Sequence, residues 1–241
     1  TRQSCYPCGV SGIYKQREAL ALYVHIPFCE TKCPYCDFNT YAGIEQLIPT
    51  YIDALVKEIN LWAAALGPIL VGTIFFGGGT PSYLPDEHIG QLLSNIRSAF
   101  TLSDDTEITL ESNPGDITVE RLNSWRSHGI NRLSIGVQSL DDGLLQALGR
   151  RHTSQEAINA IGRAKTSGFD NVSVDLMYGL PDQSFDQWGR TLKNILDLGP
   201  QHMSLYCLTL EQGTPLESWV RDGRVGTPDE DLAAEMYELA E

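Results

Sequence analysis

The chain contains 241 residues, which is enough for one sizeable domain or two small ones. Its hydrophobic content of 42% and charged content of 20% are typical of an ordinary soluble globular protein. The net charge of −14 argues against a nucleic acid or an anionic membrane as partner, because the overall field would repel either one. No apolar run approaches the roughly 20 residues that span a bilayer, and no signal peptide is visible. Six cysteines, three of them in one loop, favour a reducing compartment, and we expect a cytoplasmic protein.

Residues 1–18 show no periodic pattern, and we expect them to form an unstructured N-terminal extension. Their Cys5 and Cys8 form a Cys-x2-Cys pair, which is typical of half a zinc site or of a redox pair, but no second pair of this kind accompanies it. The chain opens at Thr1 without a methionine, and its last predicted helix, 228–241, stops in mid-pattern. We therefore expect a truncated protein in which a core domain spans 19–213 and the start of a C-terminal region spans 214–241.

Strand-like and helix-like segments alternate from Ala19 onward. Repeated strand–helix units predict an α/β fold with six parallel strands joined by right-handed crossovers, as a curled or closed sheet. Helical spacing is clearest between Ile52 and Trp62, and Thr153 with Glu156 predicts a capping box. The predicted strands are 20–25, 73–76, 107–111, 132–137, 171–178 and 202–208, and the predicted helices are 48–66, 86–100, 119–128, 154–167 and 185–196.

Three cysteines, Cys29, Cys33 and Cys36, follow the first predicted strand with the spacing Cys-x3-Cys-x2-Cys. Three cysteines so close together cannot all pair as disulfides, and thiolates packed this way need a cation or a cluster between them. A structural zinc site needs a fourth ligand nearby, and the next cysteine is Cys207. Three thiolates suit a four-iron cluster with one iron left open. Buried or zinc-bound cysteines are the alternative.

Residues able to bind a ligand follow several other predicted strands. The Gly-rich segment 77–82 lets backbone amides approach a ligand closely, although such a segment is often only a turn. Glu111 ends the third strand and either binds a ligand or supports the following turn. Asp175 lies among apolar residues of the fifth strand, where an acid is costly to bury unless it is paired or used. Arg150 is a candidate partner for a carboxylate, or a solvated surface residue.

The cysteine spacing, with an aromatic residue before the last cysteine, resembles that of the radical S-adenosylmethionine (SAM) superfamily, in which SAM chelates the open iron. The segments Tyr-Val-His-Ile-Pro-Phe-Cys, Gly-Gly-Gly-Thr-Pro-Ser, Glu-Ser-Asn-Pro-Gly, Leu-Ser-Ile-Gly-Val-Gln-Ser and Arg-Arg-His-Thr are similar to those of a narrower family. It comprises oxygen-independent coproporphyrinogen III oxidase and a HemW-like heme-chaperone branch. The resemblance implies a parallel (β/α)6 partial TIM-barrel of the radical SAM type, with the C-terminal domain truncated here. It implies Cys29, Cys33 and Cys36 as cluster ligands and SAM contacts at Tyr23, Tyr35, Gly78, Gly79, Thr80, Glu111, Gln138, Arg150 and Asp175.

Two further residues carry looser expectations from the same resemblance. Tyr206, in the sixth predicted strand, would face the adenine of SAM. His25 would lie near the cluster, or it is a histidine satisfied at the end of a strand.

One position separates the two branches of the family. The oxidase has a further cysteine two residues after its third ligand, whereas this chain has Phe38 there. We therefore expect a HemW-like heme chaperone that carries a [4Fe-4S] cluster and SAM, with heme as cargo and with a heme-acceptor protein and an electron donor as partners. The heme-binding segment is expected beyond Glu241. The alternatives are an oxidase that decarboxylates two propionates of coproporphyrinogen III, and a degenerate cluster protein with neither activity.

Overall fold

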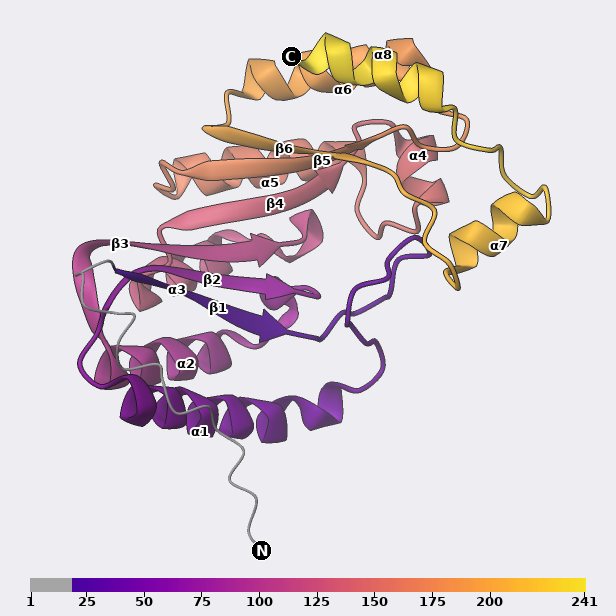
Figure 1. Cartoon of the computed structure of the whole chain (residues 1–241). Coiled ribbons are helices and arrows are strands. Elements are labelled where there is room, and N and C mark those ends of the chain that lie inside the picture. Colours follow the sequence, from indigo (N-terminus) through magenta and orange to yellow (C-terminus); the bar gives the residue numbers. More distant parts are fainter. Residues whose placement is uncertain (1–18) are drawn as a thin grey trace, which may run out of the picture.

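Six strands form one sheet in which each strand lies beside the next strand of the chain, and all neighbouring pairs are parallel. The structure is a computed structural model that describes residues 19–241, so the predicted extension with Cys5 and Cys8 lies outside the described residues. The sheet curls into an open half-barrel, which confirms the predicted α/β partial barrel (Figure 1). The strands are β1 (Leu20–Ile26), β2 (Leu70–Gly78), β3 (Thr101–Ser112), β4 (Arg132–Gln138), β5 (Val172–Tyr178) and β6 (His202–Cys207).

Helices cover the outer face of the half-barrel, and each packs against the next in the order α1, α2, α3, α5, α6 and α8 (Figure 1). No helix among residues 19–241 combines the length and the apolar character needed to cross a bilayer. The helices are α1 (Ile48–Leu66), α2 (Asp86–Ala99), α3 (Val119–His128), α4 (Asp142–Ala147), α5 (Ser154–Thr166), α6 (Phe185–Leu198), α7 (Pro215–Arg221) and α8 (Glu230–Ala240), with the short 3-10 turns η2 (Glu45–Leu47), η3 (Pro81–Tyr83) and η4 (Pro114–Asp116).

Helix starts follow local capping chemistry. The predicted capping box at α5 is confirmed, because the Thr153 side chain accepts from the Glu156 backbone N–H and the Glu156 carboxylate accepts from the Thr153 N–H. Ser184 and Gln187 form a second capping box at α6. These local bonds satisfy N–H groups that a helix leaves unpaired at its first turn.

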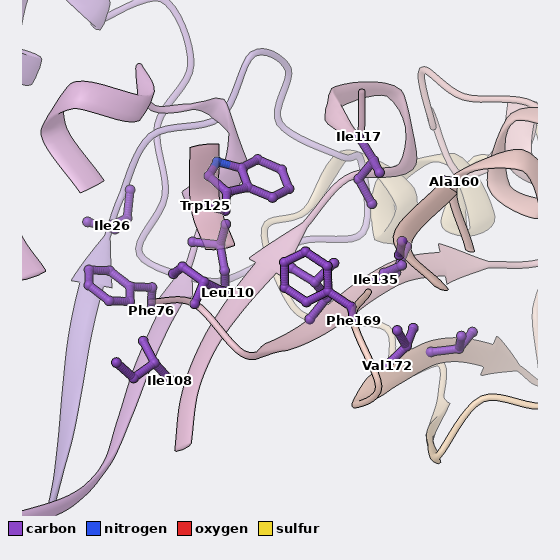
Figure 2. Packing of buried hydrophobic residues seen from close by; sticks show 14 of the residues in the cluster. Ile26, Phe76, Ile108, Leu110, Ile117, Trp125, Ile135, Ala160, Phe169 and Val172 are labelled. Atoms are coloured by element: carbon purple, nitrogen blue, oxygen red, sulfur yellow. The ribbon is translucent and has the colours of Figure 1, made fainter. Parts of the chain in front are cut away.

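The main core lies between the sheet and the outer helices (Figure 2). Ile26, Phe76, Leu110 and Ile135 come from four successive strands and pack with Trp125 of α3, and all five have 0% of their surface exposed. Successive residues of a strand point to opposite faces of the sheet. The neighbours of these core residues along each strand therefore face the concave side. Both faces of a parallel sheet are usually apolar, whereas this concave face carries polar residues, which makes it the place to look for a site.

The sheet is longer than the sequence pattern predicts. β2 begins at Leu70 and includes Gly77 and Gly78, and β3 begins at Thr101 rather than at 107. The additional residues include glycines and the pair Asp104 and Asp105, which have weak strand propensity. The strands extend because Gly77 and Gly78 pair with β1, and because Thr101 and Leu102 pair with β2. The short helices α4 and α7 were not predicted. Leu216 of α7 packs with Met177 of β5 in a second, smaller apolar cluster.

Candidate functional site

The carboxyl ends of the six strands surround one pocket of about 400 Å³, the place where α/β barrels bind their ligands. Among the predicted site residues, all except Tyr23 line this pocket. Tyr206 lines it as well, from the edge strand β6. The lining residues from the predictions are Cys29, Cys33, Cys36, Tyr35, Gly78, Gly79, Thr80, Glu111, Gln138, Arg150 and Asp175.

The cysteine loop, defined here as residues 27–41, contains little regular structure and is closed by a few bonds between its ends. The N–H of Cys29 donates to the carbonyl of Tyr41 at 2.9 Å, and the N–H of Tyr41 donates to the carbonyl of Pro27 at 2.7 Å. Lys32 bends back so that its ammonium donates to the carbonyls of Phe38 and Thr40 at 3.1 and 3.2 Å. The lysine therefore stabilises the conformation of this loop, and its ammonium group is not free for a ligand.

The three thiols of the loop are free of disulfides and have hydrogen-bond donors beside them. The Thr80 hydroxyl donates to the sulfur of Cys29 at 3.5 Å, and Arg150 Nη1 donates to the sulfur of Cys33 at the same distance. Burial is the main cause that raises the pKa of the Cys29 thiol, and Cys33 and Cys36 add to it by repulsion. The Cys29 thiolate is hard to form here unless a positive centre offsets its charge, which fits an iron–sulfur cluster.

Among residues 19–241, no three His, Cys, Asp or Glu side chains converge as the ligands of a single metal ion would. A cluster is larger than a single ion, so its ligands surround it from further away. The donor set of three unpaired thiols around one pocket, with an arginine and a threonine as their donors, fits a cluster held by three thiolates.

The glycines after β2 allow this segment to approach the cysteine loop. A side chain on Gly79 would put its first carbon 2.8 Å from the Phe28 carbonyl oxygen and 3.0 Å from the sulfur of Cys29. Gly78 has a φ of 116°, and the same atom added there would meet the ring of His25 at 2.6 Å. The segment is therefore more than a surface turn, because its glycines bring the backbone next to the cysteines.

Two buried carboxylates face the pocket from β3 and β5. Burial raises the pKa of Glu111 to about 7, although the N–H of Gly78 donates to its carboxylate at 3.1 Å. Burial also raises the pKa of Asp175, and the Ser134 hydroxyl lies 3.1 Å from both of its oxygens. Buried acids with raised pKa values in a pocket are typical of a functional site, and these two would attract a cationic ligand group.

Arg150 and Gln138 lie together on the side of β4. Arg150 Nη2 donates to the carbonyl of Gly136 at 2.9 Å, so this arginine is buried and paired, not solvated. Gln138 has a φ of 66° at a bulge of β4, an unfavourable conformation for a residue with a side chain. Backbone strain of this kind concentrates at binding sites.

Tyr23 and His25 lie on β1 outside the pocket lining. Tyr23 is 60% exposed and stacks on Phe75, with ring centroids 6.1 Å apart. The Nδ1 of His25 lies 3.2 Å from the Tyr23 hydroxyl, and its Nε2 lies 3.0 Å from the carbonyl of Asn39. Both nitrogens are thus satisfied, as in the second interpretation of His25, and a role for Tyr23 with SAM stays a prediction.

Several pocket residues carried no sequence-based expectation. Thr40 and Ser134 contribute hydroxyls, and Arg151 makes ion pairs at the rim. Arg151 follows the predicted Arg150 in the Arg-Arg-His motif, and this motif indicated that the segment belongs to the site. No local pattern marks the two hydroxyls, because Thr40 reaches the pocket through the fold of the cysteine loop and Ser134 through the register of β4.

A half-barrel with three thiols at the carboxyl ends of its strands defines a class of cluster-binding α/β proteins, and comparisons with known proteins agree with it. The Radical SAM superfamily model matches residues 23–195, more than two thirds of the chain. A mouse protein named radical S-adenosyl methionine domain-containing protein 1, mitochondrial, is 44% identical over 90% of this chain and 49% of its own length. Heme chaperone HemW of Bacillus subtilis is 39% identical over 90% of this chain and 58% of its own.

Among solved structures, coproporphyrinogen III oxidase (HemN) from Escherichia coli, described as a radical SAM enzyme, is similar with a TM-score of 0.83 and 31% identity. The match covers 91% of this chain and 51% of that one. The chain therefore belongs to the radical SAM superfamily, in the family of HemN and HemW. It spans about half the length of the curated relatives it matches. The cofactors of this family are a [4Fe-4S] cluster and SAM, and the thiols described above fit the cluster.

Proposed function

We propose that this protein is a HemW-like heme chaperone that carries a [4Fe-4S] cluster and SAM and delivers heme to an acceptor protein. The observation that carries the proposal is Phe38, which lines the pocket where the oxidase pattern has a further cysteine. Heme chaperones are also among the relatives at about 40% identity, with Escherichia coli HemW at 42%. When bound, the cluster supplies an electron to the sulfonium of SAM, which is the radical chemistry of the superfamily.

The residues around the pocket have separate roles in this proposal. Cys29, Cys33 and Cys36 hold the cluster, and Thr80 and Arg150 stabilise the thiolate charge at two of them. The carboxylates of Glu111 and Asp175, with the amide side chain of Gln138, would bind the cationic and hydroxyl groups of SAM. The two acids are partly buried, and the lower local dielectric constant strengthens these bonds.

The charge of the pocket favours the chaperone over the oxidase. Its lining contains five acidic residues and three basic ones. Each base already has partners: Lys32 binds loop carbonyls, Arg150 binds Gly136 and Cys33, and Arg151 binds Glu30 and Asp116. A substrate with four carboxylates would find no unengaged cation among the described lining residues. The propionates of heme meet the same obstacle, so we propose that heme binds at another surface.

The oxidase is the second candidate, because the HemN structure is 31% identical and superimposes well. In that function the pocket would bind coproporphyrinogen III, and two of its propionates would each lose a β-hydrogen to the radical derived from SAM and their carboxyl group as CO₂, leaving vinyl groups.

The acceptor protein and the electron donor belong to the proposal of a chaperone as well. We expect a reducing compartment, because free thiols must be kept reduced. We propose the cytoplasm. The mitochondrion is the alternative, because the mouse relative is named as a mitochondrial protein.

One experiment separates the two candidates. The protein is reconstituted anaerobically with iron and sulfide and incubated with SAM, a reductant and coproporphyrinogen III, while heme binding is measured in parallel. We expect heme to be retained and no porphyrin product to form. Formation of protoporphyrinogen would make this protein an oxidase despite Phe38.

The cluster assignment has its own test in the same preparation. Cys33→Ala should lose the iron and sulfide that the wild type retains, because only two ligands remain. Cys207→Ala removes the exposed cysteine of β6 and should keep both. Unchanged iron content in Cys33→Ala would contradict the ligand assignment.

A further inference from the structure

The cysteine loop has few anchors to the rest of the molecule. Its isolated bridge between Phe28 and Tyr41 lies within the loop itself, and the N–H of Thr80 after β2 donates to the carbonyl of Phe28 at 2.9 Å. At its tip, the N–H of Leu216 in α7 donates to the carbonyl of Pro34 at 2.9 Å. Beside the first cysteine, Glu30 forms an ion pair with Arg151. That ion pair is therefore the charged contact that joins this branch of the loop to the segment after β4.

Arg151 connects the cysteine loop to two other loops of the pocket. Its Nη1 faces Glu30, and its Nη2 donates to Asp116 in η4 at 2.6 Å. The second oxygen of Asp116 accepts from the Ser82 hydroxyl in η3, also at 2.6 Å. The series Glu30, Arg151, Asp116 and Ser82, called the strap below, joins the loops that follow β1, β4, β3 and β2.

The burial of the strap makes it stronger than an ordinary surface ion pair. The side chain of Asp116 is 9% exposed and that of Arg151 is 24% exposed, whereas Glu30 is about half exposed. An ion pair in solvent contributes little, but the loss of one partner from a buried pair leaves an uncompensated charge. The contact between Arg151 and Asp116 is thus the more stable part of the strap, and the contact between Arg151 and Glu30 is the part that breaks more easily.

We propose that Arg151 is a positioning residue, which holds the cysteine loop closed over the pocket through Glu30 and so sets the spacing of the three thiols before a cluster binds. Without it, the segment next to Cys29 keeps only the contacts of Thr80 after β2 and has no side-chain anchor to the loops after β3 and β4. The proposal rests on the assignment of Cys29, Cys33 and Cys36 as cluster ligands. It applies to a chaperone and to an oxidase alike, because it concerns the cluster site and not the cargo.

The test measures thiol alkylation of the reduced, cluster-free protein. Iodoacetamide is the probe, and mass spectrometry of peptides gives a rate constant for each cysteine. Arg151→Gln should speed alkylation of Cys29 by about fivefold, the size of effect expected from loss of a partly buried ion pair. The direction is informative. Removal of a positive charge by itself would make a thiolate harder to form and would slow alkylation, so only opening of the loop gives a faster rate.

Coupling between the two ends of the strap gives the second readout. Glu30→Gln should also speed alkylation of Cys29, and the two changes together should speed it by clearly less than the product of their separate effects, because both changes break the same contact. Asp116→Asn is the further variant if Arg151→Gln fails to fold. The rate at Cys207, on β6, should stay unchanged in every variant.

Arg132→Gln is the matched control. Arg132 on β4 lies 4.0 Å from the carboxylate of Glu107 on β3, and these side chains are 16% and 44% exposed, but the pair touches neither the cysteine loop nor the strap. This variant should be less stable to denaturant and should keep the wild-type rate at Cys29. A Cys29 rate that is unchanged or slower in folded Arg151→Gln would overturn the proposal. Iron retained in Cys33→Ala would instead show that the ligand assignment, on which the proposal rests, is at fault.

Discussion

Glu111 illustrates how a single buried residue makes the stability of this protein depend on pH. Burial is the main cause that raises its pKa from an ordinary 4.5 to about 7, and repulsion by Asp175 adds to it. An acid with a raised pKa in the folded state binds its proton more tightly there than in the unfolded state. Its effect is therefore to make folding less favourable as the pH rises from about 4.5 to about 7.

Glu111→Gln should reduce this loss. We expect the variant without bound SAM to be more stable than the wild type at pH 8, by at most about 3 kcal/mol, and to differ little from it at pH 4.5. Other groups contribute to the remaining slope, among them Asp175, whose pKa burial raises, and His152, whose pKa burial lowers to about 4. Denaturant unfolding at both pH values measures the effect, and Glu87→Gln, at an exposed position of α2, is the control. An equal stability difference between variant and wild type at both pH values would contradict the role of Glu111.

At the scale of the element, α6 depends on its first turn. The Ser184 hydroxyl accepts from the N–H of Gln187 at 3.3 Å, and the Gln187 side chain accepts from the N–H of Ser184 at 2.8 Å. These bonds satisfy backbone groups next to Trp188, which is completely buried against the barrel. The start of the helix and its packing are thus set by adjacent residues.

Ser184→Ala should lower the free energy of unfolding by about 1 kcal/mol, the usual cost of losing a side-chain cap. Ser98→Ala is the control. Ser98 donates to the carbonyl of Ser94 within α2, where alanine is the better helix former, so no loss is expected. Urea unfolding followed by circular dichroism measures both variants. Equal losses in the two would show that the capping box contributes nothing.

At the scale of the whole molecule, α8 completes the row of outer helices. Met236 has 0% of its surface exposed, and its carbonyl accepts from the Trp188 indole N–H at 2.8 Å. The contact joins the last helix to α6 and so to the strands that carry Asp175 and Tyr206 (Figure 1). A defect in α8 should therefore be felt by the entire half-barrel.

Met236→Ala should cost about 2 to 4 kcal/mol of unfolding free energy, because it leaves a cavity in a fully buried position. Leu239 of the same helix is 46% exposed, and Leu239→Ala should cost no more than about 0.5 kcal/mol. A single shift of the whole denaturant transition in Met236→Ala would show that α8 unfolds together with the barrel. Similar, small losses in both variants would mean that α8 is bound only loosely.

The sequence by itself was sufficient for the fold class, the six strands and the cysteine triad. These features are encoded locally: alternation of strand and helix patterns predicts parallel units, capping boxes mark helix starts, and Cys29, Cys33 and Cys36 are close in the chain. Even so, the predicted start of β3 at residue 107 was wrong, because pairing with β2 begins at Thr101 and the strand continues through Asp104 and Asp105, which have little strand propensity.

Only the tertiary structure decided which side chains meet around the pocket. Glu30 and Arg151 are far apart in the chain, as are Gly79 and Asp175, and no local pattern connects them. Tyr23 shares a motif with the cysteines but lies outside the pocket lining, because its strand position points it toward Phe75. The physical reason is that strand register and the curl of the sheet set the distances between loops, and those depend on the packing of the whole barrel.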